Sequence, residues 1–133
     1  IVDAVSALIF GRLFDKKGFL ALSLSTFVAS FYSIFAFGNS TSAIILGAVL
    51  WGIGMGAQES ILKAAIGKLV DKKVRATAYG FFNAIFGIAW FAGSALIGLL
   101  YSINLVALMT VSVISELCAF IILIRITYLT KKA

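Results

Sequence analysis

Long apolar segments alternate with short polar turns along the whole chain, and this pattern predicts a membrane protein built from helices. The apolar segments are expected at about residues 1–14, 19–37, 43–70, 77–100 and 105–126. At about 1.5 Å per residue, the last four are long enough to cross a hydrocarbon core of about 30 Å, whereas 1–14 reaches only about 21 Å. The sequence therefore predicts an all-α transmembrane bundle with one partial and four complete spanning helices.

The turns between these segments are of two kinds. A charged turn at 11–18 has a near copy at 67–73, whereas the loops at 38–42 and 101–104 carry no charge. Two crossings return the chain to the side that it left, so both charged turns and the basic C-terminal tail fall on one side. Because Lys and Arg in short loops favour the cytoplasm, we expect that side to be cytoplasmic and the protein to lie in the plasma membrane.

Composition supports a membrane location and narrows the possible chemistry. Of the 133 residues, 62% are hydrophobic and only 12% are charged, against roughly 45 to 50% and 25% in soluble domains. The net charge of +6 comes from turns and tail without a basic stripe, so nucleic acid is not an expected partner. The chain has no His and Cys118 is its single Cys. We therefore expect no enzyme activity, catalytic residue, metal site or cofactor.

Three acidic residues fall inside the expected membrane segments: Asp3, Glu59 and Glu116. An ionised carboxylate near the bilayer centre costs at least about 2.5 kcal/mol, so each needs an explanation. Asp3 lies twelve residues before Asp15, and Glu59 lies twelve before Asp71, which puts both about 18 Å from the basic side. We expect the three acids to line a polar cavity near the midplane, in proton coupling or substrate contact. The alternative is that each is a structural group with a hydrogen-bonding neighbour.

Polar and aromatic side chains near these acids are further candidates for a solute site. Gln58, Asn83 and Trp90 could contact a polar solute or could bridge helices. Lys63 follows Glu59 by four residues and could pair with it, although it is also placed to extend its amine to the basic side.

Small residues are expected to let helices approach closely in lipid, either for tight packing or as a surface that slides or rocks. They form one stripe in the third segment and a second stripe in the fourth: Gly47, Gly52, Gly54 and Gly56, then Ala84, Gly87, Gly93, Ser94 and Gly98. The chain has no Pro, so any helix bend is expected at a glycine.

The charged turn Gly11-x-x-x-Asp15-Lys16-x-Gly18 resembles the loop motif of the major facilitator superfamily. In that motif Gly11 would allow close helix approach, and Asp15 could cap the next helix. The family pattern continues with two basic residues where this chain has apolar ones, which fits the looser second copy of the motif.

A second stretch carries the same resemblance. Residues 75–83, Arg-Ala-Thr-Ala-Tyr-Gly-Phe-Phe-Asn, are similar to the start of the family's eleventh helix. Together the two matches imply that residues 1–133 form part of helix eight and helices nine to twelve of a C-terminal six-helix half. The expected partners are the lipid bilayer, a small solute and the missing N-terminal half.

The resemblance implies a secondary active transporter that works by alternating access, with proton coupling as one option. Glu59 and Glu116 would contact substrate or protons, and Asp15, Asp71 and Arg75 would belong to the cytoplasmic loop motifs. The alternative is a small helical membrane interaction or assembly protein without transport activity. The number of spanning helices upstream of Ile1 discriminates between the two.

Overall fold

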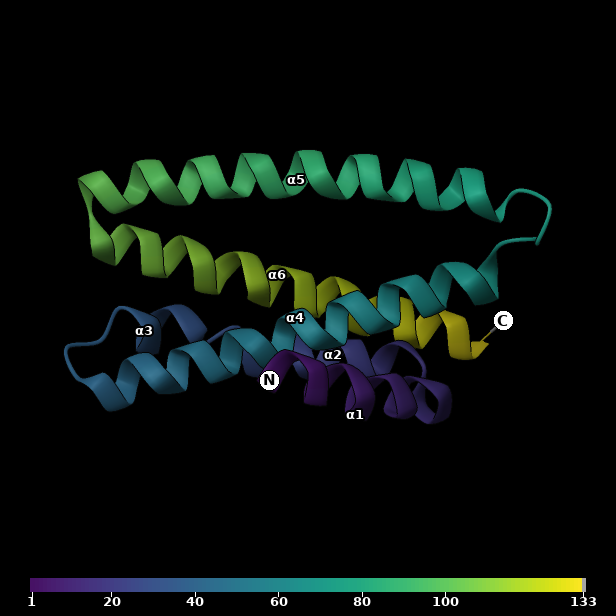
Figure 1. Ribbon diagram of the computed structural model, residues 1–133, viewed down its shortest axis with the longest axis horizontal. Helices are drawn as coiled ribbons and strands as arrows, with labels where there is room; N and C mark the ends of the chain where they lie inside the picture. Colours follow the sequence, from purple (N-terminus) through teal and green to yellow (C-terminus); the bar gives the residue numbers. More distant parts are fainter. Residues whose placement is uncertain (133) are drawn as a thin grey trace.

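The computed structural model describes residues 1–132 as a bundle of roughly parallel and antiparallel helices (Figure 1). The helices are α1 Val2–Lys17, α2 Phe19–Ala29, α3 Tyr32–Ala36, α4 Thr41–Leu69, α5 Arg75–Ile103 and α6 Leu105–Lys132, and no strand occurs among the described residues. Four stretches are long and apolar enough to cross a membrane: Phe19–Ala36, α4, α5 and Leu105–Thr130. The predicted all-α membrane bundle is confirmed. Ala133 and the side chains of Lys131 and Lys132 lie outside the described structure.

Helix α4 is the element against which α1, α2 and α3 pack. Its glycines make this possible on two sides, as the sequence predicted for this segment. A Cβ at Gly56 would collide with the backbone carbonyl oxygen of Asp3 in α1, and one at Gly54 would lie 2.7 Å from the Cβ of Ala29 in α2. The helix backbones therefore approach each other more closely than side chains would permit.

The small residues of α5 behave differently from those of α4. A Cβ at Gly80, Gly87, Gly93 or Gly98 would meet no atom within 4 Å, and α5 has no buried residue. Tight packing along this stripe is therefore not found among the described residues, and the alternative of a sliding surface stays a prediction. The reason is visible in Figure 1, where α5 joins the bundle through α4 and α6 and carries no helix on its outer side.

The second apolar segment is broken between α2 and α3, although it contains no glycine at that point. Ser30 Oγ donates a hydrogen bond of 2.7 Å to the carbonyl oxygen of Phe27, and Ser30 N is shared between the carbonyl oxygens of Thr26 and Phe27. Serine side chains that bond back to the preceding turn bend helices. The prediction that bends occur at glycine is therefore wrong here, because a serine provides the alternative hydrogen bond.

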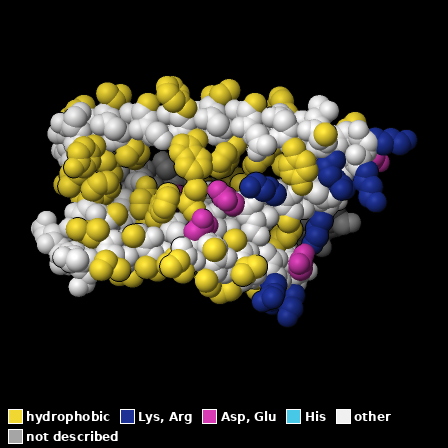
Figure 2. Space-filling model, in the orientation of Figure 1, with side chains coloured by type: hydrophobic (Ala, Val, Ile, Leu, Met, Phe, Trp, Pro, Cys, Tyr) yellow, Lys and Arg dark blue, Asp and Glu magenta, His cyan; other side chains and the backbone are white. Residues whose placement is uncertain are grey.

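The two charged turns meet at one end of the bundle. Lys68 Nζ lies 2.8 Å from Asp15 Oδ1 and 4.9 Å from the centre of the Phe14 ring, so it joins the end of α4 to the end of α1. Figure 2 shows Lys and Arg side chains gathered over this end. Because Asp15 pairs with Lys68, it does not cap the following helix as predicted; α2 begins at Gly18 without a side-chain cap.

Close approach and backbone conformation explain both glycines of the first charged turn. A Cβ at Gly11 would lie 2.8 Å from Ser60 Oγ on α4. Gly18 is the one described residue with positive φ, at 60°, and it connects α1 to α2 as a single-residue link. Glycine adopts this conformation without the steric cost that a Cβ would add.

We predict that Gly56→Ala lowers the stability of the full-length protein by about 1 to 3 kcal/mol, because the added methyl group forces α1 away from α4. Gly80→Ala is the matched control, since its Cβ would enter open space. Thermal unfolding followed by size-exclusion chromatography in detergent measures the difference. Equal stability of the two variants would contradict the observed packing.

We predict a weak coupling between Asp15 and Lys68, below about 1 kcal/mol, because their side chains are 69% and 56% exposed. A double-mutant cycle with Asp15→Asn and Lys68→Gln, measured by unfolding in mixed micelles, gives this value. The pair Asp15→Asn and Lys72→Gln serves as control and should show no coupling. A coupling above about 2 kcal/mol would mean that the ion pair is shielded from water.

Candidate functional site

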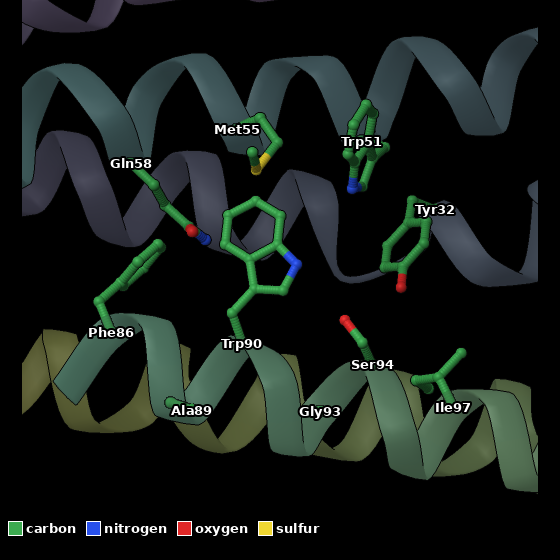
Figure 3. Close-up of a pocket in the computed structure, with 10 residues that line it drawn as sticks. All are labelled: Tyr32, Trp51, Met55, Gln58, Phe86, Ala89, Trp90, Gly93, Ser94 and Ile97. Carbon is green, nitrogen blue, oxygen red and sulfur yellow. The ribbon is translucent and has the colours of Figure 1, made fainter. Parts of the chain in front are cut away.

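A cleft of about 390 Å³ lies between α4 and α5 (Figure 3). Helix α4 contributes Trp51, Met55 and Gln58, whose spacing of four and three residues places them on one face of the helix. Helix α5 contributes Phe86, Ala89, Trp90, Gly93, Ser94 and Ile97, and α3 contributes Tyr32. The volume falls within the usual range for small-molecule sites.

Aromatic rings dominate the walls of this cleft. In Figure 3 the indole of Trp90 extends from α5 toward Met55 and Gln58 on α4. The Phe86 ring lies 5.5 Å from the Trp90 ring, edge to face, and 5.7 Å from the Phe82 ring. These contacts hold the Trp90 side chain in a row of rings along α5.

Tyr32 lies at one end of the cleft and is held there by a hydrogen bond. Its hydroxyl lies 3.1 Å from Ser112 Oγ on α6, and Figure 3 shows Ser94 of α5 facing it across the cleft. The break after α2 places Tyr32 at the first position of α3. The cleft therefore receives residues from three helices, α3, α4 and α5.

Two smaller cavities adjoin the cleft, and Gln58 lines both. One, of about 140 Å³, is lined by Gln58 and Phe86 together with Glu59, Leu62, Lys63, Phe82 and Asn83. The other, of about 80 Å³, shares Tyr32, Trp51, Met55 and Gln58 with the cleft and adds Ala29, Gly54 and Glu116. Gln58 thus shares a cavity with each of two carboxylates that belong to different helices, Glu59 of α4 and Glu116 of α6.

Neither carboxylate has a partner among the described side chains. The ion pair of Asp15 with Lys68 is the one salt bridge in the part of the chain whose side chains are described, so Lys63 does not pair with Glu59. The backbone carbonyl of Lys63 instead accepts a hydrogen bond of 2.8 Å from Tyr79 Oη, which ties the start of α5 to α4. Both glutamates are therefore available to a ligand or a proton.

The structure separates the third membrane acid from the other two. A Cβ at Gly56 would lie 2.8 Å from Asp3 Oδ1, so Asp3 sits on the side of α4 that packs against α1. It lines neither the cleft nor the two adjoining cavities. Glu59, Glu116, Gln58 and Asn83 do come together around these cavities, and their roles stay predictions.

The loop-motif residues of the second charged turn stabilise that turn. Asp71 Oδ1 accepts a hydrogen bond of 2.9 Å from Lys73 N. Arg75 Nη2 donates one of 3.2 Å to the carbonyl oxygen of Val70. Lys16, in the last turn of α1, is exposed at the same basic end.

Several cleft residues were not singled out from the sequence: Tyr32, Trp51, Met55 and Phe86. A signal was present on both long helices. Trp51, Met55 and Gln58 recur at helical spacing, as do Phe86 and Trp90, within segments otherwise rich in small residues. Tyr32 had no such signal, since its position depends on the break in the second segment.

Comparison with known proteins agrees with this architecture. The chain is 36% identical over 124 residues to the uncharacterized protein Mb2288 of Mycobacterium bovis and to the uncharacterized proteins MT2327 and Rv2265 of Mycobacterium tuberculosis. The matched region covers 93% of this chain and 30% of each relative, so the chain spans about a third of their length. No solved structure gives a significant match. A family model of the Major Facilitator Superfamily matches residues 1–133, and the chain therefore belongs to this family of multi-pass membrane transporters.

Proposed function

We propose that this chain is most of the C-terminal half of a secondary active transporter, which moves a small solute by alternating access. The observation that carries the proposal is the cleft between α4 and α5, where aromatic side chains and the amide of Gln58 meet between two membrane-spanning helices. Transporters of this kind bind solute near the midplane, between units that rock against each other. The greater length of the mycobacterial relatives supports a second unit in the same polypeptide.

The open face of α5 supports the same proposal. Its glycines at 80, 87 and 98 have free space around them, so a further helix could lie close to the α5 backbone and slide along it. The missing N-terminal half would supply helices to this side of the cleft. The cleft would then be enclosed by both halves and exposed to each compartment in turn.

In this proposal the two glutamates next to Gln58 contact solute or carry protons. A carboxylate can take up and release a proton, which a proton-coupled transporter requires. Proton symport or antiport would follow from that exchange. Glu59 and Glu116 are preferred to Asp3, because they line cavities that share residues with the cleft and Asp3 does not.

The basic end of the bundle would face the cytoplasm, with the C-terminus on the same side and the protein in the plasma membrane. The gathering of Lys and Arg at that end supports this orientation. Asp15 and Asp71 would stabilise the cytoplasmic turns, the former by its ion pair with Lys68 and the latter by its bond to the backbone of the turn.

We predict that a cysteine at Ser94 of the full-length protein reacts with a charged maleimide from both sides of the membrane. The test uses a cysteine-free background, including Cys118→Ser, in right-side-out and inverted vesicles. Alternating access exposes the cleft to each side in turn, so both vesicle types should label. Ile88→Cys is the control; its side chain is 71% exposed on α5, on the side of the helix opposite the cleft residues, and would face lipid, so it should label from neither side.

Labelling of Ser94→Cys from one side only would contradict alternating access. It would favour a membrane interaction or assembly protein whose cleft does not change its exposure.

We predict that Glu59→Gln combined with Glu116→Gln abolishes the dependence of uptake on a proton gradient, because an amide cannot take up and release a proton at these positions. The full-length protein is reconstituted in liposomes, and a panel of radiolabelled sugars, amino acids and organic ions identifies a transported solute. Uptake of that solute is then measured with and without a pH gradient. Wild-type stimulation by the gradient in the double variant would exclude coupling through these residues.

A further inference from the structure

We infer that the cleft between α4 and α5 binds organic cations that carry an apolar body. This inference rests on the proposed transport function and specifies the solute class. It combines two observations, one from the cleft and one from the smaller cavity that shares lining residues with it: a set of aromatic rings and a carboxylate without a basic partner.

The aromatic rings come from three helices and surround the cleft. Trp51 and Trp90 lie on opposite helices, with Tyr32 at one end and Phe86 at the other. The face of an aromatic ring attracts a cation, most strongly for Trp, and the attraction grows when water is excluded. Aromatic cages of this kind recognise quaternary and other bulky cations, whose apolar groups pack on the rings.

The ionisable side chain on the α6 side of the cleft is a carboxylate. Glu116 lines a cavity that shares Tyr32, Trp51 and Gln58 with the cleft. No Lys or Arg lines the cleft or this cavity, and Glu116 forms no ion pair with the described side chains. A carboxylate beside several aromatic rings favours a positively charged ligand over a neutral or negative one.

The other charged groups near the cleft lie at one end of it. Glu59 and Lys63 both line the adjoining cavity toward the basic end, and their charges oppose each other there. The net charge that faces the aromatic part therefore comes from Glu116. An anionic solute would meet this carboxylate without a compensating base, which disfavours it.

The volume of the cleft suits a ligand of moderate size. About 390 Å³ accommodates several apolar groups around a central charge. Met55 contributes a flexible side chain directly opposite Trp90 (Figure 3), and methionine adapts to irregular apolar shapes. Because of that adaptability, the cleft is expected to accept several different cations of this class.

The test compares tetraphenylphosphonium with tetraphenylborate, two ions of nearly the same shape and opposite charge. Equilibrium binding of radiolabelled tetraphenylphosphonium to the full-length protein is measured in nanodiscs, and binding to empty nanodiscs is subtracted. We expect saturable binding of the cation and no saturable binding of radiolabelled tetraphenylborate, each measured in a separate sample because the two ions pair in one solution. Absence of saturable cation binding, or saturable binding of the anion with equal affinity, would overturn the inference.

Variants connect the binding to the two observations. Glu116→Gln and Trp90→Ala are each expected to weaken binding about tenfold or more. Glu116→Asp, which keeps the charge, should stay closer to wild type, and Phe91→Ala, next to Trp90 but away from the cleft, should bind as wild type does. Wild-type affinity of Glu116→Gln would overturn the role of the carboxylate.

Folding is checked for every variant by size-exclusion chromatography. If Glu116→Gln does not fold, the comparison of Trp90→Ala with Phe91→Ala decides, and equal affinities of these two overturn the inference.

The binding test and the labelling test fail independently. If Ser94→Cys labels from both sides but the cation does not bind, transport stands and the solute class is wrong. If the cation binds with the expected variant pattern but Ser94→Cys labels from one side, the cation site stands and alternating access is wrong.

Discussion

Close backbone contact along α4 is the constraint on which the rest of this bundle depends. Within lipid, apolar side chains gain little by leaving the hydrocarbon for each other, so helices associate through packing at short range. Gly52 and Gly56 admit α1, and Gly47 and Gly54 admit the broken pair α2 and α3. A larger residue at Gly56 would meet the backbone of α1, which cannot move aside as a flexible side chain can.

The glycine contacts also determine where α4 can present large side chains. At about 100° per residue, the two glycine faces leave an arc between them that holds Trp51, Met55 and Gln58. These are the α4 residues of the cleft. Packing and binding are thus divided around one helix: its small residues contact α1 to α3, and its large polar and aromatic residues remain available toward α5.

The sequence predicted the helices well because a membrane span is specified by a local property, the length of an uncharged apolar run. It also predicted the basic end of the bundle, since Lys and Arg occur in every second turn and in the C-terminal tail. It was wrong about Asp15, because a lysine 53 residues away competes for the carboxylate. It also missed the break at Ser30, which depends on a local hydrogen bond that hydropathy does not register.

The candidate site was only partly accessible to sequence reasoning for a related reason. Gln58, Asn83 and Trp90 stand out as polar or large residues in apolar segments, and the structure brings them to one side of α4. Asp3 stands out equally but lies elsewhere. Its position along the helix sets its depth in the membrane, but it does not set which side of the bundle the residue lies on. Helix packing decides which acids share a cavity, and the sequence of a single segment does not specify that packing.

The single-residue link at Gly18 has a mechanical consequence. A connection of one residue with φ near 60° has no slack, so α1 and α2 cannot change their separation at that end without breaking the reversal. The connection from α4 to α5 runs through residues 70–74, and α5 is fastened by few buried contacts. Helices α1, α2 and α3 pack on α4, and α2 also packs on α6, whereas α5 has no buried residue. Any displacement of α5 relative to α4 changes the width of the cleft.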